Sequence, residues 1–124
     1  MSERTPSAAG LVALPCACAN LRRAARSVTQ LYDEELRGSG MRATQFTLLQ
    51  ALSRLGRITQ GHLGELLALD STTLTRSLKP LVKRAWVRSV PGKDRRERHL
   101  QLTTAGRRQL DRVQPLWERA QQRL

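Results

Sequence analysis

The chain has 124 residues, with 22 Lys and Arg against 10 Asp and Glu, and a formal net charge of +12. This length supports one domain with a hydrophobic core, and the positive charge favours an anionic partner, either nucleic acid or a membrane surface. Aromatic residues make up only 3% of the chain, which argues against single-strand binders that stack bases on aromatic platforms. No apolar run approaches the roughly 20 residues that cross a bilayer, so we expect a cytoplasmic protein without a membrane partner.

The N-terminal segment is rich in Ser, Pro, Gly and Ala, which predicts a disordered tail over residues 1–13 and a folded domain over residues 14–124. An apolar series at steps of three and four then predicts a long helix over about residues 15–37. This series consists of Leu14, Cys18, Leu21, Ala25, Val28 and Tyr32. The glycines at 38 and 40 are expected to end the helix, because glycine readily adopts the backbone that follows a helix terminus.

Two shorter helices and a strand are predicted next. A helix over about residues 44–54 has an apolar face and closes at Gly56. Residues 57–58 form a candidate strand, and Thr59 is a good N-cap for a short helix over residues 60–68. The inward-facing residues of these helices are predicted to be Phe46, Leu48, Leu49, Leu52, Leu55, Leu63, Leu66 and Leu67.

A polar helix and a basic hairpin follow between Asp70 and Leu102. Either Asp70 or Ser71 can cap the helix, and one face of it carries only hydroxyls and cations. That face consists of Ser71, Thr72, Thr75, Arg76, Lys79 and Lys83. β-prone runs at residues 86–90 and 99–102 flank a turn at residues 91–94, which predicts a hairpin.

This layout is typical of a winged helix-turn-helix, a mainly α-helical fold with a small β wing. The helix fits the major groove of DNA, and the basic tip of the hairpin can reach phosphates or the minor groove. Residues 79–112 contain 11 Lys and Arg against three Asp and Glu, so most of the net positive charge lies there. The alternative is a solvated charged helix beside a solvated hairpin, but such concentrated charge repels itself and favours an anionic polymer.

A last helix is predicted over about residues 104–124, starting at Thr103 or Thr104 and bent by Pro115. Its apolar stripe, like that of the first helix, is longer than a small domain needs. Both stripes are therefore expected to be buried against a second copy of the chain. A two-fold dimer would place two recognition helices about one turn of DNA apart.

Taken together, residues 16–124 resemble the MarR family of bacterial transcription regulators. The most specific segment is residues 94–106, which resembles the family's pattern of Asp, any residue, Arg, then a strand ending in Leu-Thr and a helix start with Gly. Thr44-Gln45-Phe46 and Leu74-Thr75-Arg76 are similar to the family's second and recognition helices. The resemblance implies a triangular homodimer in which the helices at about 15–37 and 104–124 form the interface.

The resemblance also implies a function. Family members bind pseudo-palindromic double-stranded operators, usually as repressors released by a small molecule or an oxidant, and we expect the same here, at the nucleoid. The winged helix-turn-helix lobe spans about residues 42–102. By position, Arg96 resembles the wing arginine that enters the minor groove, and Asp94 resembles the residue that holds the wing. The predicted DNA-binding residues are Ser71, Thr72, Thr73, Thr75, Arg76, Lys79, Lys93, Arg95, Arg96 and Arg98.

Two positions depart from the family pattern. Ala85 stands where the family usually has glycine between the recognition helix and the wing; a left-handed backbone there would cost about 1 kcal/mol. Arg42 stands where the family usually has the Ser or Thr that caps the second helix, so Thr44 is expected to cap it later. A ligand pocket between the dimer helices and the winged lobe is also expected from the resemblance.

The two cysteines are Cys16 and Cys18. If both lie in a helix they point in different directions and cannot bond to each other. Cys18 resembles the oxidised cysteine of the family's peroxide-sensing branch, and Tyr32 resembles one of the tyrosines of the partner subunit that contact it. Arg22 stands where a second tyrosine is expected, and its charge would favour the thiolate. The alternative is that both cysteines are small helix-packing residues.

Other function classes remain as alternatives. A basic amphipathic membrane protein would carry its cations along one helix face with aromatics, and here they concentrate on the hairpin. A thiol redox enzyme using Cys18 would need a nearby general base or a strand–helix redox motif, and the sequence has neither. His62 and His99 lie far apart, so no metal cluster or cofactor is expected. A non-specific protein that coats the chromosome is the remaining alternative to a specific regulator.

Overall fold

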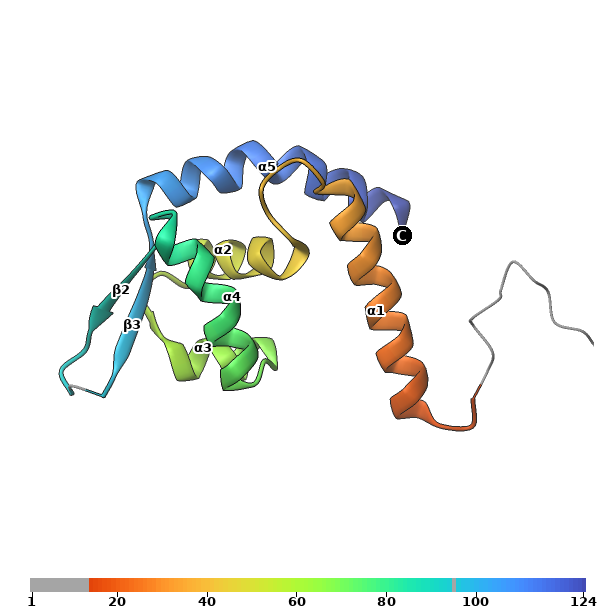
Figure 1. Ribbon diagram of the computed structural model, residues 1–124, viewed down its shortest axis with the longest axis horizontal. Coiled ribbons are helices and arrows are strands. Elements are labelled where there is room, and N and C mark those ends of the chain that lie inside the picture. The colour runs from red at the N-terminus through yellow and green to blue at the C-terminus, as the bar shows by residue number, and fades with distance from the viewer. Residues whose placement is uncertain (1–13, 95) are drawn as a thin grey trace, which may run out of the picture.

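The computed structural model describes residues 14–94 and 96–124, so the predicted tail over residues 1–13 and Arg95 lie outside the described residues. Figure 1 shows the elements, in the order α1 (Ala17–Glu35), α2 (Ala43–Leu55), β1 (Ile58–Thr59), α3 (Gln60–Leu67), α4 (Ser71–Lys83), β2 (Val87–Pro91), β3 (Arg98–Leu102) and α5 (Thr104–Arg123). The predicted class, mainly α-helical with a small β wing, is confirmed.

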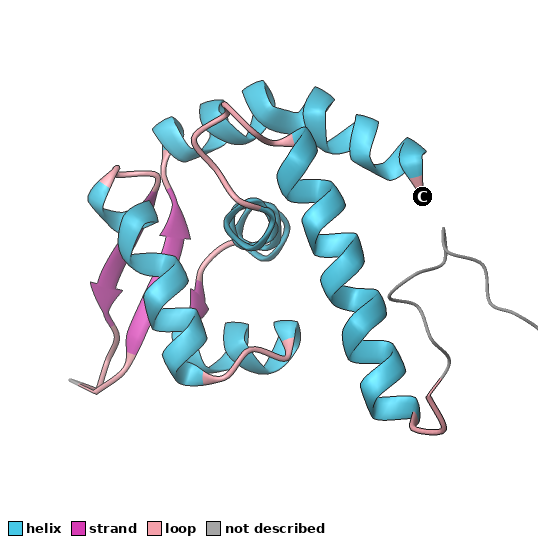
Figure 2. Cartoon of the chain, turned by 45° about the vertical axis from the view of Figure 1, so that its right-hand side comes forward, coloured by secondary structure: helices cyan, strands magenta, loops and turns pink. Residues whose placement is uncertain are grey.

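Helices α2, α3 and α4 and the sheet form a compact lobe, and the two terminal helices extend beyond it (Figure 1). In Figure 2, α2 is seen end-on at the centre, with α5 above it and α3 below. Helix α5 packs on both α1 and α2 and runs through Pro115 as one helix. Helix α1 descends from the far end of α5 and lies clear of the lobe over most of its length (Figures 1 and 2).

The sheet is antiparallel with the strand order β1-β3-β2. Strands β2 and β3 form the hairpin, in which Ser89 lies opposite Leu100. Strand β1 adds to the other edge of β3, where Ile58 lies opposite the same leucine. This confirms the prediction of a short strand around Ile58, one residue later than expected, and it anchors the base of the wing to the lobe.

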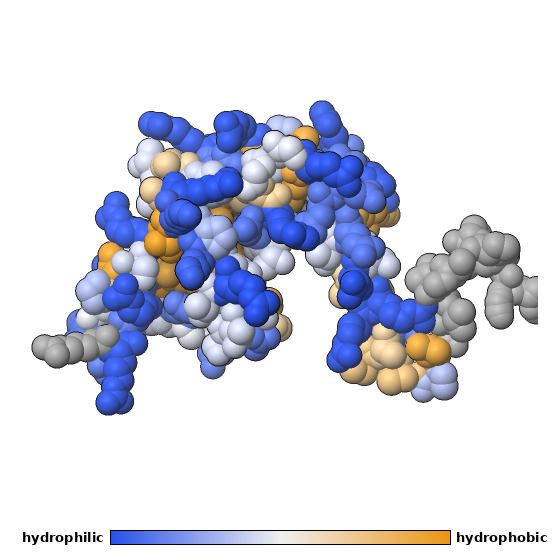
Figure 3. All heavy atoms as spheres, viewed as in Figure 1, coloured by the Kyte–Doolittle hydropathy of each residue, from blue (hydrophilic) through white to orange (hydrophobic). Residues whose placement is uncertain are grey.

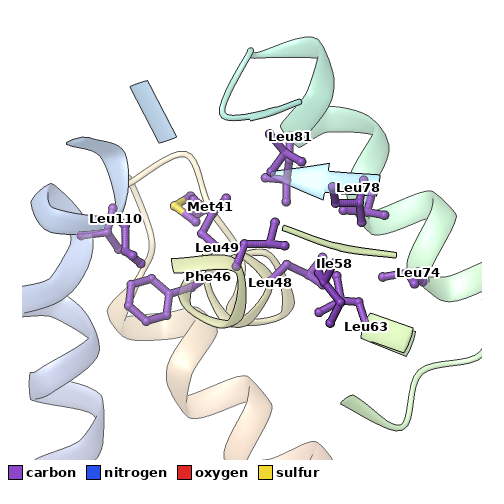
Figure 4. Packing of buried hydrophobic residues seen from close by; sticks show 14 of the residues in the cluster. Met41, Phe46, Leu48, Leu49, Ile58, Leu63, Leu74, Leu78, Leu81 and Leu110 are labelled. Carbon is purple, nitrogen blue, oxygen red and sulfur yellow. The ribbon is translucent and has the colours of Figure 1, made fainter. Parts of the chain in front are cut away.

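The core of the lobe is built around α2, which packs on α4 and β3 within the lobe and on α5 above it. Figure 4 shows Leu48 directed toward Ile58 and Leu63, while Phe46 points toward α5. The Phe46 ring stacks on Trp117 of α5, with ring centroids 5.8 Å apart. Full burial of a Leu or Phe side chain stabilises the fold by roughly 1.5–3 kcal/mol, so this cluster holds the recognition elements in place. The fully buried large side chains are Leu36, Phe46, Leu48, Leu49, Leu52, Leu63, Leu74, Leu81, Val87, Leu100 and Val113.

Three helices begin at the caps that the sequence predicts. Thr59, Asp70 and Thr103 each accept a hydrogen bond from the backbone amide three residues later, at 3.1, 2.8 and 2.9 Å. Each cap satisfies one of the amides that a helix start leaves without an intrahelical partner. These contacts define where α3, the recognition helix α4 and α5 begin.

The start of α2 differs from the prediction. Thr44 does not cap the helix; Arg42 is the N-cap residue, and its own amide donates to the Gln45 side chain at 3.0 Å. The capping carboxylate comes from α1, where Asp33 accepts from the Ala43 amide at 2.7 Å. An arginine side chain has no acceptor, so a residue from another helix satisfies the amide instead.

Both helices of the helix-turn-helix end at an alanine in the left-handed region. After α4, the amides of Ala85 and Trp86 donate to the carbonyls of Val82 and Leu81, both at 2.9 Å. This pattern requires a left-handed residue at Ala85, whose φ is +62°. Ala85 therefore meets the condition under which the replacement of glycine by alanine strains the backbone, and Ala68 after α3 has the same conformation, with φ +54°, which was not expected.

Candidate nucleic-acid interface

The polar face of α4 is exposed, and the opposite side of the helix is buried in the lobe. Leu74, Leu78 and Leu81 point inward, each at most 4% exposed. Because these leucines recur every three or four residues, the residues between them are left on the outside. The outer residues that line one shallow groove along the helix are Ser71, Thr72, Thr75, Arg76 and Lys79.

Thr73 differs from the other hydroxyl residues of this helix. Its amide and its hydroxyl both donate to the Asp70 carboxylate, at 2.8 and 2.9 Å. The amide bond, followed by the hydroxyl bond, lowers the pKa of Asp70 below its usual 3.8. The hydroxyl proton of Thr73 is therefore engaged within the first turn, and its role in DNA contact stays a prediction.

The wing is a short hairpin held by its own backbone. The Asp94 carboxylate accepts from the Arg96 amide at 3.1 Å, and its carbonyl accepts from the Glu97 amide at 2.9 Å. The Gly92 amide donates to the Glu97 carbonyl at 2.8 Å. Asp94 therefore bonds to both sides of the turn, as expected of a residue that holds it.

Cations surround this turn and the face of α4. Lys93, Arg96 and Arg98 are exposed on the wing. Among the described residues, none of these three, nor Arg76 or Lys79, has an ion-pair partner. In the view of Figure 3, the lower end of the hairpin is strongly hydrophilic. Unpaired cations keep their charge available for phosphates.

A groove of about 850 Å³ lies between α3, the start of α4 and the wing. Ser71, Arg96 and Arg98 line it, so the structure brings predicted residues from two elements around one hollow. Gln60 also lines it, and its side-chain amide donates to the Thr75 hydroxyl at 3.2 Å. Gln60 was not among the residues predicted for the site; its position directly after the Thr59 cap was the available signal.

A second, smaller pocket of about 350 Å³ lies where α1, α2 and α5 meet. Phe46 and Trp117 line its inner side, and Val28 and Tyr32 of α1 line its outer side. The Tyr32 hydroxyl donates to the Gln121 side chain there. The pocket lies between the terminal helices and the lobe, where the family resemblance led us to expect one.

The cysteine region is only partly as predicted. Cys16 and Cys18 are free and exposed, but Cys16 is the N-cap of α1 with extended backbone, so the premise that both lie in the helix is wrong. The Arg22 guanidinium donates to the Cys18 sulfur at 3.8 Å. Tyr32 lies about 21 Å further along the same helix, at 1.5 Å per residue, and faces α5. One subunit therefore does not bring Tyr32 to Cys18.

Other kinds of site are not found in residues 14–94 and 96–124. No group of three or more His, Cys, Asp and Glu side chains there is placed to hold a metal ion. No helix in the described part of the chain is both long and apolar enough to span a membrane.

The chain is similar to known transcription regulators. The MarR family model matches residues 39–97. The regulator MosR of M. tuberculosis, solved in complex with DNA, is 40% identical with a TM-score of 0.77; the match covers 86% of this chain and 77% of MosR. A mutant MarR of E. coli, solved with operator DNA, is 27% identical with a TM-score of 0.71, covering 86% of this chain and 81% of MarR.

A curated relative agrees with these structures. YwoH of Bacillus subtilis (strain 168), described as an uncharacterized helix-turn-helix-type transcriptional regulator, is 27% identical over 93 residues, 75% of this chain and 68% of YwoH. The family match spans α2 to the wing, the part that holds the polar face of α4. Similarity to MosR extends over most of both chains. The chain therefore belongs to the MarR family of transcriptional regulators.

Proposed function

We propose that this chain is a sequence-specific double-stranded DNA-binding regulator that acts as a homodimer on pseudo-palindromic operators. The observation that carries the proposal is the position of the exposed polar face of α4 beside the unpaired wing cations. A polar helix end fits the major groove, and an arginine on a hairpin fits a narrow, electronegative minor groove. The protein would then work at the nucleoid, in the cytoplasm.

The two regions have different roles in this proposal. Thr72, Thr75 and Arg76 lie in the first two turns of α4, the part of a recognition helix that reaches base edges. Arg76 can bind guanine in a bidentate manner, and the hydroxyls can bond bases or phosphates. Arg96 enters the minor groove. Ser71, Thr73, Lys79, Lys93, Arg95 and Arg98 are assigned to supporting contacts, mainly with phosphates.

The homodimer is supported by the surface of α1. No residue of α1 is buried within one subunit, and Leu21 and Val28 are 70% and 36% exposed. Leu124 at the end of the chain is 66% exposed as well. Figure 3 shows hydrophobic residues at the surface around the N-terminal end of α1. A second copy is the simplest partner for the α1 stripe, because a two-fold interface buries the same surface on both subunits. The expectation that the α5 stripe also faces a second copy is wrong for Leu110, Val113 and Ala120, which are at most 6% exposed within one subunit because α5 packs on α1 and α2.

The regulation that we propose is repression released by a small molecule. The pocket between α1, α2 and α5 supports this, because a ligand there contacts both the terminal helices and the lobe. If a ligand binds only when the two lobes have a particular spacing, it shifts the population of dimers toward that spacing. The aromatic side chains of Tyr32, Phe46 and Trp117 favour a small aromatic compound.

An oxidant is the second candidate signal, favoured by the exposed Cys18 thiol beside Arg22. Peroxide would oxidise this thiol to sulfenic acid while being reduced to water. Peroxide should then release DNA from the wild type but not from Cys18→Ser. Equal responses of both proteins would assign the cysteines to packing.

Specific DNA binding is tested by selecting duplexes from a randomised library and by mapping protected genomic DNA. The selected duplex should bind about a thousandfold or more tightly than random duplex at physiological salt. A ratio near one would contradict the proposal and favour a non-specific chromosome coat. Vesicles of anionic lipid at the same salt concentration test the membrane alternative.

A further inference from the structure

The recognition helix has one side-chain hydrogen bond to a neighbouring helix that the predicted function does not explain. Gln60 is the first residue of α3, directly after the Thr59 cap, and is half-buried. Its side-chain nitrogen donates to the Thr75 hydroxyl oxygen at 3.2 Å. Thr75 lies on the exposed face of α4, so this bond joins the first turn of α3 to the middle of the DNA-facing surface.

The hydroxyl of Thr75 accepts a hydrogen bond from a side chain, whereas the hydroxyls of three other helical threonines donate. In α1 and α2, the hydroxyls of Thr29 and Thr47 donate to the carbonyl four residues earlier, at 2.8 and 3.0 Å. In α4, the hydroxyl of Thr73 donates to Asp70 at 2.9 Å. Thr75 accepts from Gln60, and its own proton has no acceptor among the described residues. A hydroxyl has one proton to donate, so that of Thr75 remains available at the surface.

We propose that Gln60 is a positioning residue for DNA recognition, which makes the Thr75 hydroxyl a hydrogen-bond donor toward the DNA. While the amide occupies a lone pair of the oxygen, the Thr75 proton points away from Gln60. The matching DNA groups are acceptors, namely guanine O6 or N7, adenine N7, thymine O4 or a phosphate oxygen. The amino groups of cytosine and adenine donate, and only one lone pair of the Thr75 oxygen remains for them, so Thr75 held in this way favours acceptors. This inference rests on the proposed DNA-binding function.

The location of Gln60 suits this role. It lines the groove between α3, the start of α4 and the wing, close to where Arg96 and Arg98 border the same hollow. Duplex DNA bound to α4 and the wing would cover this groove and exclude water from the Gln60–Thr75 bond. A hydrogen bond shielded from water contributes more than an exposed one, so DNA binding strengthens the constraint on Thr75.

A double-mutant cycle tests the proposal, with affinity measured for a duplex selected by the wild type from a randomised library. Thr75→Val should weaken binding about tenfold, and Gln60→Ala about threefold to fivefold. The double variant should bind no more weakly than Thr75→Val alone, because Gln60 acts through the Thr75 hydroxyl. The matched control is Thr72→Val combined with Gln60→Ala, whose effects should multiply.

Gln60→Glu sharpens the test, because an ionised carboxylate can only accept and draws the Thr75 proton toward itself. Binding should fall more than in Gln60→Ala, and the excess should shrink in the Thr75→Val background, where only charge repulsion remains. Binding to duplexes with each base at each position separates the acceptors. A loss confined to one position identifies a base edge, and an even loss identifies a phosphate.

Independent effects of Gln60→Ala and Thr75→Val on a duplex that the wild type distinguishes from random DNA would overturn this inference and leave the proposed function intact. A wild type without sequence preference would overturn the proposed function instead. The same cycle on random duplex would then still decide whether Gln60 acts through Thr75. Thermal unfolding of every variant confirms that the lobe is folded.

Discussion

The lobe from α2 to β3 and the helix α1 carry apolar stripes of similar spacing but bury them to very different extents. Phe46 of α2 is 1% exposed and stacks on Trp117, whereas α1 has no buried residue. A helix with a wide apolar face needs a partner, and in the lobe that partner is within the same chain. The difference indicates that one subunit folds the DNA-reading part by itself, while α1 depends on another surface.

Removing the aromatic centre of the lobe gives the largest expected effect. Phe46→Ala should lower the free energy of unfolding by about 3–5 kcal/mol, because it removes a buried ring and leaves a cavity against Trp117. Chemical denaturation measures this change. Leu21→Ala on α1 is the comparison, since the side chain is 70% exposed in one subunit. The comparison is made at protein concentrations at which the chain is monomeric. If both variants then lose the same free energy of unfolding, the stability of the lobe and that of α1 do not differ in the way described.

A charge on the α1 stripe tests the dimer directly. Leu21→Glu should weaken dimerisation about a hundredfold, because it would bury an unpaired carboxylate between subunits. Light scattering at micromolar protein should change from twice 14.0 kDa toward 14.0 kDa. Ser27→Glu adds the same charge to an exposed α1 position off the stripe and should leave the mass unchanged. A monomeric wild type that binds operator DNA tightly would contradict the proposed homodimer.

The cations of the lobe should matter for DNA, unlike those of α1. Arg76→Ala should cost about 1–3 kcal/mol of discrimination at one operator position, because a base contact is lost. Arg96→Ala should weaken binding to all sequences more evenly and reduce the salt slope by about one. Affinities for operator and random duplex across a salt series measure both effects.

Arg26→Ala on α1 is the control for these variants, and neither affinity nor salt slope should change with it. An unchanged salt slope in Arg96→Ala would mean that the wing does not contact DNA. The winged-helix mechanism would then be wrong in this protein.

The smallest effect comes from the strained end of α4. Ala85→Gly should raise the free energy of unfolding by up to about 1 kcal/mol, because glycine adopts the left-handed backbone without a Cβ penalty. In Ala24→Gly, within the regular turns of α1, glycine should instead weaken the helix, by about 1 kcal/mol in the dimer. Thermal unfolding of both variants shows whether Ala85→Gly stabilises the protein and Ala24→Gly destabilises it. A destabilised Ala85→Gly would show that the side chain of Ala85 contributes more by packing than its backbone costs.

Helix periodicity and short-range caps could largely be derived from the sequence, although Leu55 and Leu66, which were predicted to face inward, are 46% and 53% exposed. Thr59, Asp70 and Thr103 cap their helices through bonds that span only three residues, so the local order of residue types determines them. The exposed face of α4 follows from the spacing of its leucines in the same way. Ala85 was singled out only by comparison with the family pattern, and whether its backbone is left-handed was left open. The predicted DNA contacts remain predictions.

Contacts between elements were decided by the tertiary structure alone. The amide at the start of α2 is capped by Asp33, ten residues earlier on another helix, and Gln60 reaches Thr75 across fifteen residues. Each bond depends on how two helices are placed relative to each other, which local propensity does not specify. That placement is set by burial of the shared core, in which Phe46 and its neighbours can pack only when α2, α4, α5 and the sheet come together.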